Sequence, residues 1–277
     1  MSIWATGDVH GDPIRLSMSA FPKQKQLTKE DYVIILGDFG VIWDHKGPNG
    51  AEKYWLDWLE EKSFTTLFID GNHENFSRLN AMPVETWQGG SVHKIRPHVI
   101  HLMRGEVFTL DDAVCFAFGG APSHDISGLV AAEELEQNYA AGILDPGDKD
   151  FAAKLSKLKK LNRYSYTHPY RIKGTEWWPE ELASEDEKQN GIENLRKHGC
   201  KVDFVFSHEG PSSAVALGWG GSFRPNPQSQ YLEEVRQLLT DEEARPAYKA
   251  WLFGHYHENR RLTDREICLY EQITRIW

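Results

Sequence analysis

Five short apolar segments, spread over almost the whole chain, each end in a small cluster of glycine or serine with Asp, Asn or His. The apolar segments are residues 3–6, 32–36, 66–69, 202–206 and 250–253. Short apolar runs bounded by turn-forming residues are typical of buried β-strands. We therefore predict five strands, each followed at once by a polar loop.

The stretches between these strands favour helices, most clearly at residues 52–62 and 230–239. Residues 266–276 are predicted to form one closing strand. An alternation of strands and helices indicates an α/β protein. Open α/β sheets bind their ligands in the crevice beyond the carboxyl ends of the strands. We therefore expect the five polar loops to meet at one site.

The middle of the chain has a different character. Residues 131–141 and 150–161 are helix-like and rich in charge, and an aromatic, polar segment follows around Tyr164 and Tyr166. The whole stretch is too short to build a core of its own. We predict a single domain over residues 1–277 with an insertion at about residues 129–170.

Composition excludes several classes of protein. The formal net charge of −10 argues against general nucleic-acid binding, which needs clustered Lys and Arg. Neither a membrane span nor a signal peptide is visible, and the three cysteines show no metal-binding spacing. We expect a cytoplasmic protein without a membrane partner, and the oligomeric state stays open.

The polar residues that follow the strands are of the types that bind transition metals. They are Asp8, His10, Asp38, Asn72, His73, His208, His255 and His257. Imidazole and carboxylate suit Mn²⁺, Fe²⁺ and Zn²⁺, and the lack of thiolate disfavours a structural zinc site. In extended chain, residues i and i+2 point the same way, so Asp8 with His10 and His255 with His257 are each expected to aim at one centre.

Two divalent ions in such a site suit a phosphate substrate. Ions about 3.5–4 Å apart clamp the oxygens of a phosphoryl group and lower the pKa of bound water toward 7. With two aspartates and a hydroxide the centre keeps a net positive charge, which attracts the substrate anion. The residues alone thus predict hydrolysis of a phosphate ester.

In order and spacing, the polar blocks resemble the five motifs of the calcineurin-like metallophosphoesterase superfamily. The blocks are Gly7-Asp8-Val9-His10-Gly11, Gly37-Asp38, Gly71-Asn72-His73-Glu74, Ser207-His208 and Gly254-His255-Tyr256-His257. The resemblance implies two mixed β-sheets packed as a sandwich and flanked by α-helices. It also implies a dinuclear enzyme that works by in-line attack of a hydroxide bridging two divalent ions.

The resemblance assigns a role to each residue. It implies that Asp8, His10 and His257 bind one ion, that Asn72, His208 and His255 bind the other, and that Asp38 bridges both. It implies that His73 protonates the leaving oxygen or stabilises the transferred phosphoryl group. We expect manganese as the metal, and iron, zinc or nickel also suit these ligands.

Two further blocks resemble a bacterial and phage branch of the superfamily. They are Phe118-Gly119-Gly120-Ala121 and Trp177-Trp178-Pro179-Glu180-Glu181. In that branch a short loop carrying an Asp and an Arg joins the two blocks, and Asp125 and Arg171 are the matching candidates. Here the predicted insertion separates them, so we hypothesise that it lies near the mouth of the site and shapes substrate choice.

The sequence leaves the substrate open between a phosphorylated small molecule, a nucleotide and a protein. The arginine that Ser/Thr protein phosphatases carry shortly after the second motif is absent from residues 37–43, so that specific activity is not implied. One alternative is a phosphodiesterase or nuclease acting on nucleotides. Another is a catalytically silent scaffold of the same fold, which the intact set of polar residues disfavours.

Overall fold

The computed structural model of the chain describes residues 1–123, 142–162, 170–240 and 245–277. Its strands are β1 Ile3–Thr6, β2 Tyr32–Leu36, β3 Thr65–Ile69, β4 Val84–Trp87, β5 Gly90–Arg96, β6 Val99–Leu102, β7 Glu106–Leu110, β8 Ala113–Phe118, β9 Ile143–Leu144, β10 Arg171–Ile172, β11 Phe204–Ser207, β12 Ala250–Phe253, β13 Arg260–Arg261, β14 Glu266–Cys268 and β15 Thr274–Arg275. Its α-helices are α1 Gly50–Glu60, α2 Phe76–Leu79, α4 Phe151–Asn162, α5 Glu185–Lys197, α6 Ser212–Trp219 and α7 Pro227–Leu238. Short 3-10 helices are η1 Pro13–Leu16, η2 Pro22–Gln26, η3 Pro179–Glu181 and η4 Gly220–Ser222.

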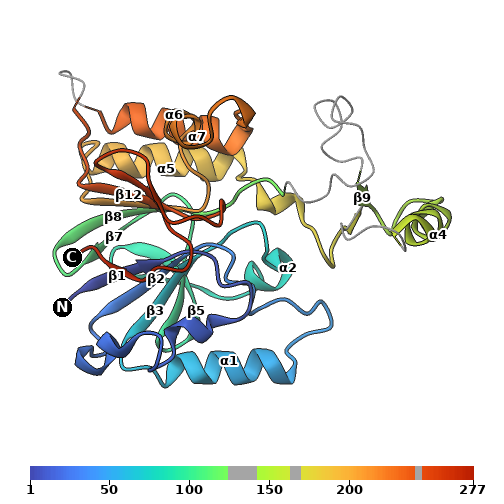
Figure 1. The fold of residues 1–277 in the computed structure, drawn as a ribbon, viewed down its shortest axis with the longest axis horizontal. Helices are drawn as coiled ribbons and strands as arrows, with labels where there is room; N and C mark the ends of the chain where they lie inside the picture. Colours follow the sequence, from blue (N-terminus) through green and yellow to red (C-terminus); the bar gives the residue numbers. More distant parts are fainter. Residues whose placement is uncertain (124–141, 163–169, 241–244) are drawn as a thin grey trace.

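Within these ranges the long strands form two mixed sheets. The first has the order β15-β1-β2-β3-β6-β5-β4, with β1, β2, β3 and β6 parallel. The second has the order β13-β14-β12-β11-β8-β7, with β8, β11, β12 and β14 parallel. Figure 1 shows the two sheets packed together, with α1 covering the first and α5, α6 and α7 covering the second. The predicted α/β sandwich of two mixed sheets is confirmed.

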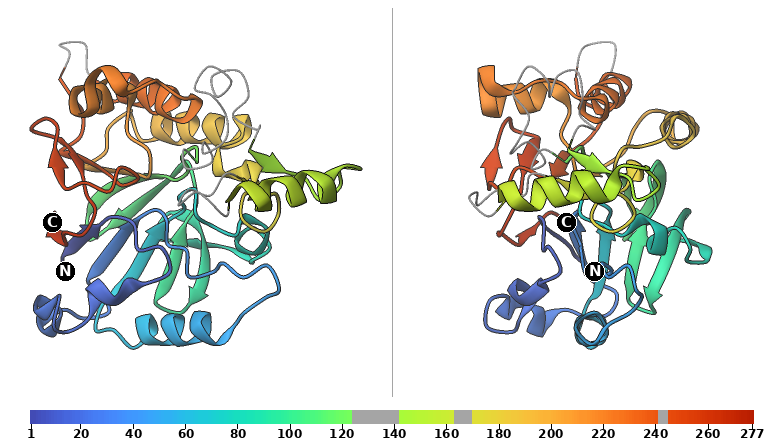
Figure 2. Two further views of the ribbon diagram at one scale, coloured as in Figure 1. Left: turned by 45° about the vertical axis from the view of Figure 1, so that its right-hand side comes forward. Right: turned by 90° about the vertical axis from the view of Figure 1, so that its right-hand side faces the viewer.

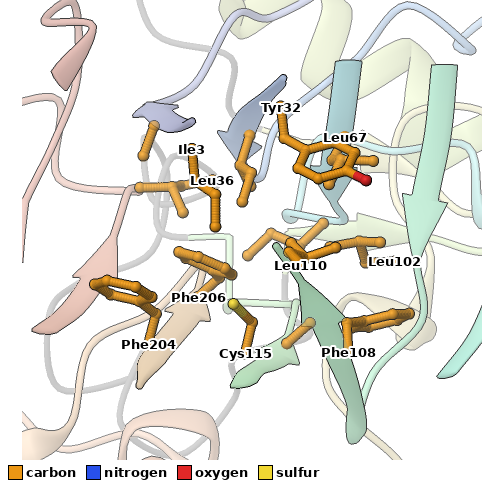
Figure 3. Close-up of a cluster of buried hydrophobic side chains, with 14 of the residues drawn as sticks. Ile3, Tyr32, Leu36, Leu67, Leu102, Phe108, Leu110, Cys115, Phe204 and Phe206 are labelled. Atoms are coloured by element: carbon orange, nitrogen blue, oxygen red, sulfur yellow. The ribbon is translucent and has the colours of Figure 1, made fainter. Parts of the chain in front are cut away.

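The alternation of side chains along β2 explains why its sequence is apolar throughout. Tyr32, Ile34 and Leu36 point into the core between the sheets, whereas Val33 and Ile35 belong to the core on the α1 side. A strand covered on both faces needs no polar residues, because successive side chains enter opposite layers. Figure 3 shows the layer between the sheets, where side chains of the second sheet, such as those of Phe204 and Phe206, meet those of the first.

The predicted closing strand over residues 266–276 is wrong. The segment contains two short strands, and these lie in different sheets: β14 pairs with β12, and β15 pairs with β1. Between them the chain crosses from one sheet to the other. There the side-chain oxygen of Asn259 accepts hydrogen bonds from the amides of Tyr270 and Gln272, and the carbonyl of Tyr270 accepts one from the amide of Gly7.

The predicted insertion is described in part. Residues 131–141, Asp125, Tyr164 and Tyr166 lie outside the described residues. The helix expected at 150–161 is present as α4, and with β9 it projects away from the two sheets (Figures 1 and 2). The division of the chain into one domain and an insertion stays a prediction. In the part of the chain that the structure describes, no helix has the length and apolar character needed to span a bilayer.

The layer between the sheets is expected to dominate stability. Phe206 is fully buried there, so Phe206→Ala should lower the free energy of unfolding by about 3–5 kcal/mol, from lost burial and an unfilled cavity. Leu217 on α6 is 68% exposed, and Leu217→Ala is the control, expected within about 0.5 kcal/mol of the parent. Urea denaturation measures both, and similar values for the two variants would contradict this account of the core.

Candidate metal centre

The predicted site residues all lie beyond the carboxyl ends of parallel strands, and the structure brings them together. Asp8 and His10 follow β1, Asp38 follows β2, Asn72 and His73 follow β3, His208 follows β11, and His255 and His257 follow β12. Parallel strands deliver their following loops to one edge of a sheet. Because the two sheets are packed with these edges at the same end, three loops of the first sheet meet two of the second.

One group of side chains gathers around Asp8. The ligand atoms of Asp8, His10, Asp38 and His257 all lie within 4.8 Å of one another. The Nε2 atom of His257 is 2.9 Å from His10 Nε2 and 3.1 Å from Asp8 Oδ2. Asp8 is fully buried, and its Oδ2 atom has no well-aligned hydrogen-bond donor in the described part of the chain. A buried anionic oxygen of this kind needs a positive partner.

A second group gathers around His208, which is also fully buried. Its Nδ1 atom lies 2.8 Å from the carbonyl oxygen of Leu36, to which it can donate. This contact fixes the ring and turns Nε2 toward the site. Many metal-binding histidines are oriented in the same way by a carbonyl oxygen that accepts from their other ring nitrogen. Nε2 then lies 3.2 Å from Asn72 Oδ1, and the ring of His255 is 5.0 Å away between centroids.

Asp38 belongs to both groups. Its Oδ2 atom lies 3.7 Å from His10 Nδ1, whereas its Oδ1 atom lies 3.3 Å from His208 Nε2. The Oδ1 atom also accepts a hydrogen bond from the backbone amide of His73, at 2.7 Å. Each oxygen of this one carboxylate therefore faces a different set of nitrogen and oxygen donors.

The backbone at the site differs from the extended geometry that the sequence suggested. His10, Asp38, His255 and His257 have φ values of 47°, 45°, 68° and 51°. The prediction that Asp8 with His10, and His255 with His257, share a direction as residues i and i+2 of extended chain is therefore wrong. Side chains converge because the chain turns sharply through the left-handed region. Such backbone costs of order 1–3 kcal/mol a residue and is concentrated at functional sites.

Charge at the site is unbalanced in a way that suits a cation. Burial alone would raise the pKa of Asp38, but the charge and hydrogen bond of His208 outweigh it and hold that pKa far below its usual value. Burial alone would lower the pKa of His208, but Asp38 and Asp8 raise it to about 10. Contact with Asp8 likewise raises the pKa of His257. The two buried carboxylates therefore favour positive charge at this point, which a divalent ion would supply.

His73 lies beside the cluster rather than inside it. Its ring meets that of His10 edge to face, with centroids 5.1 Å apart, and the ring of Trp43 lies on another side. Burial lowers the pKa of His73, and the positive charge of Arg171 lowers it further against the opposing pull of Asp38. Arg171 stands on β10, directly after the predicted insertion, so the end of the insertion is close to the site. The other candidate, Asp125, lies outside the described residues.

Glu74, a buried residue that supports the site, was not predicted from the sequence. Glu74 accepts hydrogen bonds from the amides of Phe39 and Gly40, at 2.7 and 3.2 Å, and so holds the loop after β2. Burial raises the pKa of Glu74, as do the neighbouring charges of Asp38 and Asp70. Glu74 is the last residue of the third motif, and this position was the one indication in the sequence that it has a role at the site.

A cavity of about 310 Å³ opens next to the cluster. It is lined by Pro122, Glu209, Phe223, Arg224, Asn226, His255, Tyr256 and His257. The Nη1 atom of Arg224 donates to the carbonyl oxygens of Gly221 and Phe223, at 2.8 and 3.1 Å. The cavity therefore combines aromatic side chains with a guanidinium and a carboxyl group, beside two of the predicted ligands.

Comparison with known families agrees with this site. Residues 1–259 match the family of calcineurin-like phosphoesterases, and the chain belongs to that family. No curated protein gives a match to the chain. The family makes this chain a phosphoesterase of the metal-dependent class, and the cluster around Asp8 and Asp38 supplies a donor set for the metal.

The tight approach of loops predicts one sensitive position. A Cβ atom on Gly71 would lie 2.0 Å from Asp38 Oδ1 and 2.3 Å from the Asp38 amide. Gly71→Ala should therefore lower stability by about 1–3 kcal/mol and weaken Mn²⁺ binding, because Asp38 must move. At Gly50 a Cβ would meet nothing within 4 Å, so Gly50→Ala is the control, expected to leave Mn²⁺ binding unchanged. Calorimetric titration with Mn²⁺ decides, and unchanged binding in Gly71→Ala would contradict the geometry.

Proposed function

We propose that this chain hydrolyses phosphate esters at a centre of two divalent ions, with manganese the expected metal. Asp8, His10 and His257 would hold one ion, Asn72, His208 and His255 would hold the other, and Asp38 would be available to both. The observation that carries the proposal is the position of Asp38, whose two carboxylate oxygens face separate donor groups at 3.7 and 3.3 Å. A carboxylate in that position is suited to join two ions.

The chemistry divides between the ions and the protein. When bound, two divalent ions supply a nucleophile at neutral pH and neutralise the charge of the phosphoryl group. The protein holds their ligands rigid, since Asp8, Asp38 and His208 are almost completely buried and hydrogen-bonded to backbone. Phosphoryl transfer depends mainly on such positioning and on charge stabilisation.

His73 is the candidate general acid. It lies outside the ligand groups, where a substrate oxygen can approach its ring. Burial and Arg171 lower its pKa, which favours the neutral imidazole in the resting protein. A phosphate anion beside the ring would raise this pKa again. The ring can then take up a proton from solvent and, as imidazolium, donate it to the leaving oxygen of the ester.

The cavity beside His255 and His257 is the candidate site for the rest of the substrate. Its volume of about 310 Å³ suits a small organic group, and Phe223 with Tyr256 suits one that is aromatic. This composition favours a phosphorylated small molecule or nucleotide over a folded protein. The predicted insertion returns at Arg171, whose charge lowers the pKa of His73, and this supports the hypothesis that the insertion shapes substrate choice.

Asp38→Asn tests the shared carboxylate. The change keeps the shape of the side chain but removes its charge, so Mn²⁺-dependent hydrolysis of p-nitrophenyl phosphate should fall by at least about a hundredfold. Asp57→Asn, on the exposed face of α1, is the matched control and should keep full activity. Parallel assays with the bis-p-nitrophenyl ester separate a monoesterase from a phosphodiesterase. A parent protein that binds Mn²⁺ but cleaves neither ester would favour the scaffold alternative.

His73→Asn tests the general acid. Turnover should fall by about 10²–10⁴-fold with Mn²⁺ binding retained, because general acid catalysis contributes in this range. The loss should be largest for alkyl phosphates, whose leaving oxygen needs a proton, and smaller for p-nitrophenyl phosphate. His45→Asn, at an exposed loop position, is the control. An equal loss for good and poor leaving groups would assign His73 a different role.

A further inference from the structure

A buried chain of hydrogen bonds links the segment Trp177–Glu181 to the predicted ligand Asn72, and the reaction described above makes no use of it. Glu181 is fully buried, although a carboxyl group is costly to bury. Its two oxygens accept from Ser123, from the amide at 2.9 Å and from the hydroxyl at 2.6 Å. Ser123 Oγ lies 3.2 Å from Asn72 Nδ2.

The directions of these hydrogen bonds determine which way the side-chain amide of Asn72 points. A serine hydroxyl has one proton, and Ser123 gives it to the ionised carboxylate of Glu181. Because burial raises the pKa of Glu181 to about 8, this direction holds above that pH. The hydroxyl oxygen of Ser123 can then only accept from Asn72, so the NH₂ group of Asn72 must face Ser123. The carbonyl oxygen of Asn72 is thereby turned toward His208, with its Oδ1 atom 3.2 Å from Nε2. This is the orientation that a metal ligand needs, because an NH₂ group cannot bind a cation.

A second connection holds the same two segments together. Arg104, itself buried, donates from Nε to Asp70 Oδ2 at 2.8 Å and from Nη2 to the carbonyl oxygen of Glu180, also at 2.8 Å. Asp70 lies two residues before Asn72, and its carbonyl oxygen accepts from the amide of Gly120. The Asn72 loop, the β8 loop and η3 are thus tied to one another by charged and neutral hydrogen bonds.

We propose that Glu181 and Ser123 are positioning residues that orient the Asn72 amide for metal binding. The proposal rests on the proposed function, in which Asn72 is a ligand of one ion. Without the Ser123 hydroxyl, rotation of the amide by half a turn changes its shape little and presents NH₂ to the ion. Outer-shell partners of this kind typically change metal affinity by about 10–100-fold.

The experiment is a calorimetric titration of Mn²⁺ into metal-stripped protein that carries Ser123→Ala. One binding step should weaken by about 10–100-fold, and the other should stay unchanged. At two equivalents of Mn²⁺, the electron paramagnetic resonance spectrum should change from that of a coupled pair to that of isolated ions. Ser77→Ala is the matched control: it removes the bond from Trp178 Nε1 to Ser77 Oγ, at 2.8 Å, but leaves the Asn72 chain intact.

Glu181→Gln provides a second variant of nearly the same shape. Above the pKa of Glu181, about 8, the carboxylate offers two acceptors to the two donors of Ser123 whereas a glutamine amide offers one, so at such a pH the same binding step should weaken. Thermal unfolding of each metal-free variant checks that it is folded. If Ser123→Ala does not fold, Glu181→Gln alone decides. Unchanged Mn²⁺ binding in the folded variants, or equal weakening in Ser77→Ala, would overturn the proposal.

Asn72→Ala separates failure of this proposal from failure of the proposed function. If Ser123 acts through Asn72, Ser123→Ala should have no further effect on Mn²⁺ binding in the Asn72→Ala background. If Asn72→Ala weakens one step and Ser123→Ala does not, the positioning role is wrong and the ligand assignment stands. If Asn72→Ala leaves both steps unchanged, Asn72 is not a ligand and the proposal falls with that assignment.

Discussion

Two carboxylates with almost no exposure to solvent, Asp8 and Asp38, determine which groups must surround them at the site. An ionised carboxylate out of water is stable only beside positive charge or hydrogen-bond donors. Here backbone amides of His255 and His73 donate to them, and the imidazoles of His208 and His257 lie close to the same carboxylates. The loops that follow five strands of two sheets are thereby drawn to one point. A divalent ion is the partner that this excess of donors fits best.

The sandwich of two sheets makes this meeting possible. Each sheet by itself presents its loops along an edge, at the spacing of neighbouring strands. Packing the sheets face to face adds His208 and His255, from the second sheet, to Asp38 and Asn72, from the first. The core between the sheets, built from residues such as Phe206, therefore matters for the proposed function, because it holds the two halves of the proposed ligand set together.

The sequence was sufficient for much of this. Strands β1, β2 and β12 lie where the apolar runs predicted them, because buried parallel strands leave continuous apolar segments. The polar residues after them were also found, since a strand that ends in Gly-Asp or Gly-His is easy to recognise. These signs are local, and each depends only on neighbouring residues.

What the sequence did not disclose depends on contacts between distant segments. The left-handed backbone at His10 and His257 is imposed by the crossing of loops, and neither residue type requires it. The break between β14 and β15 arises because the chain changes sheets there. Nothing near Ser123 indicates that its partners are 51 and 58 residues away.

The hydrogen bonds from Glu181 to Asn72 also help to explain how the fold accommodates the predicted insertion. Ser123 lies shortly before the predicted insertion, and β10 and η3 follow directly after it. Lengthening a loop adds little entropic cost once its ends are held, about 0.6 kcal/mol for each doubling. Glu181 and Arg104 hold those ends against the Asn72 loop. Length and sequence between the two ends can therefore vary at little cost while the contacts of the Asn72 loop are kept.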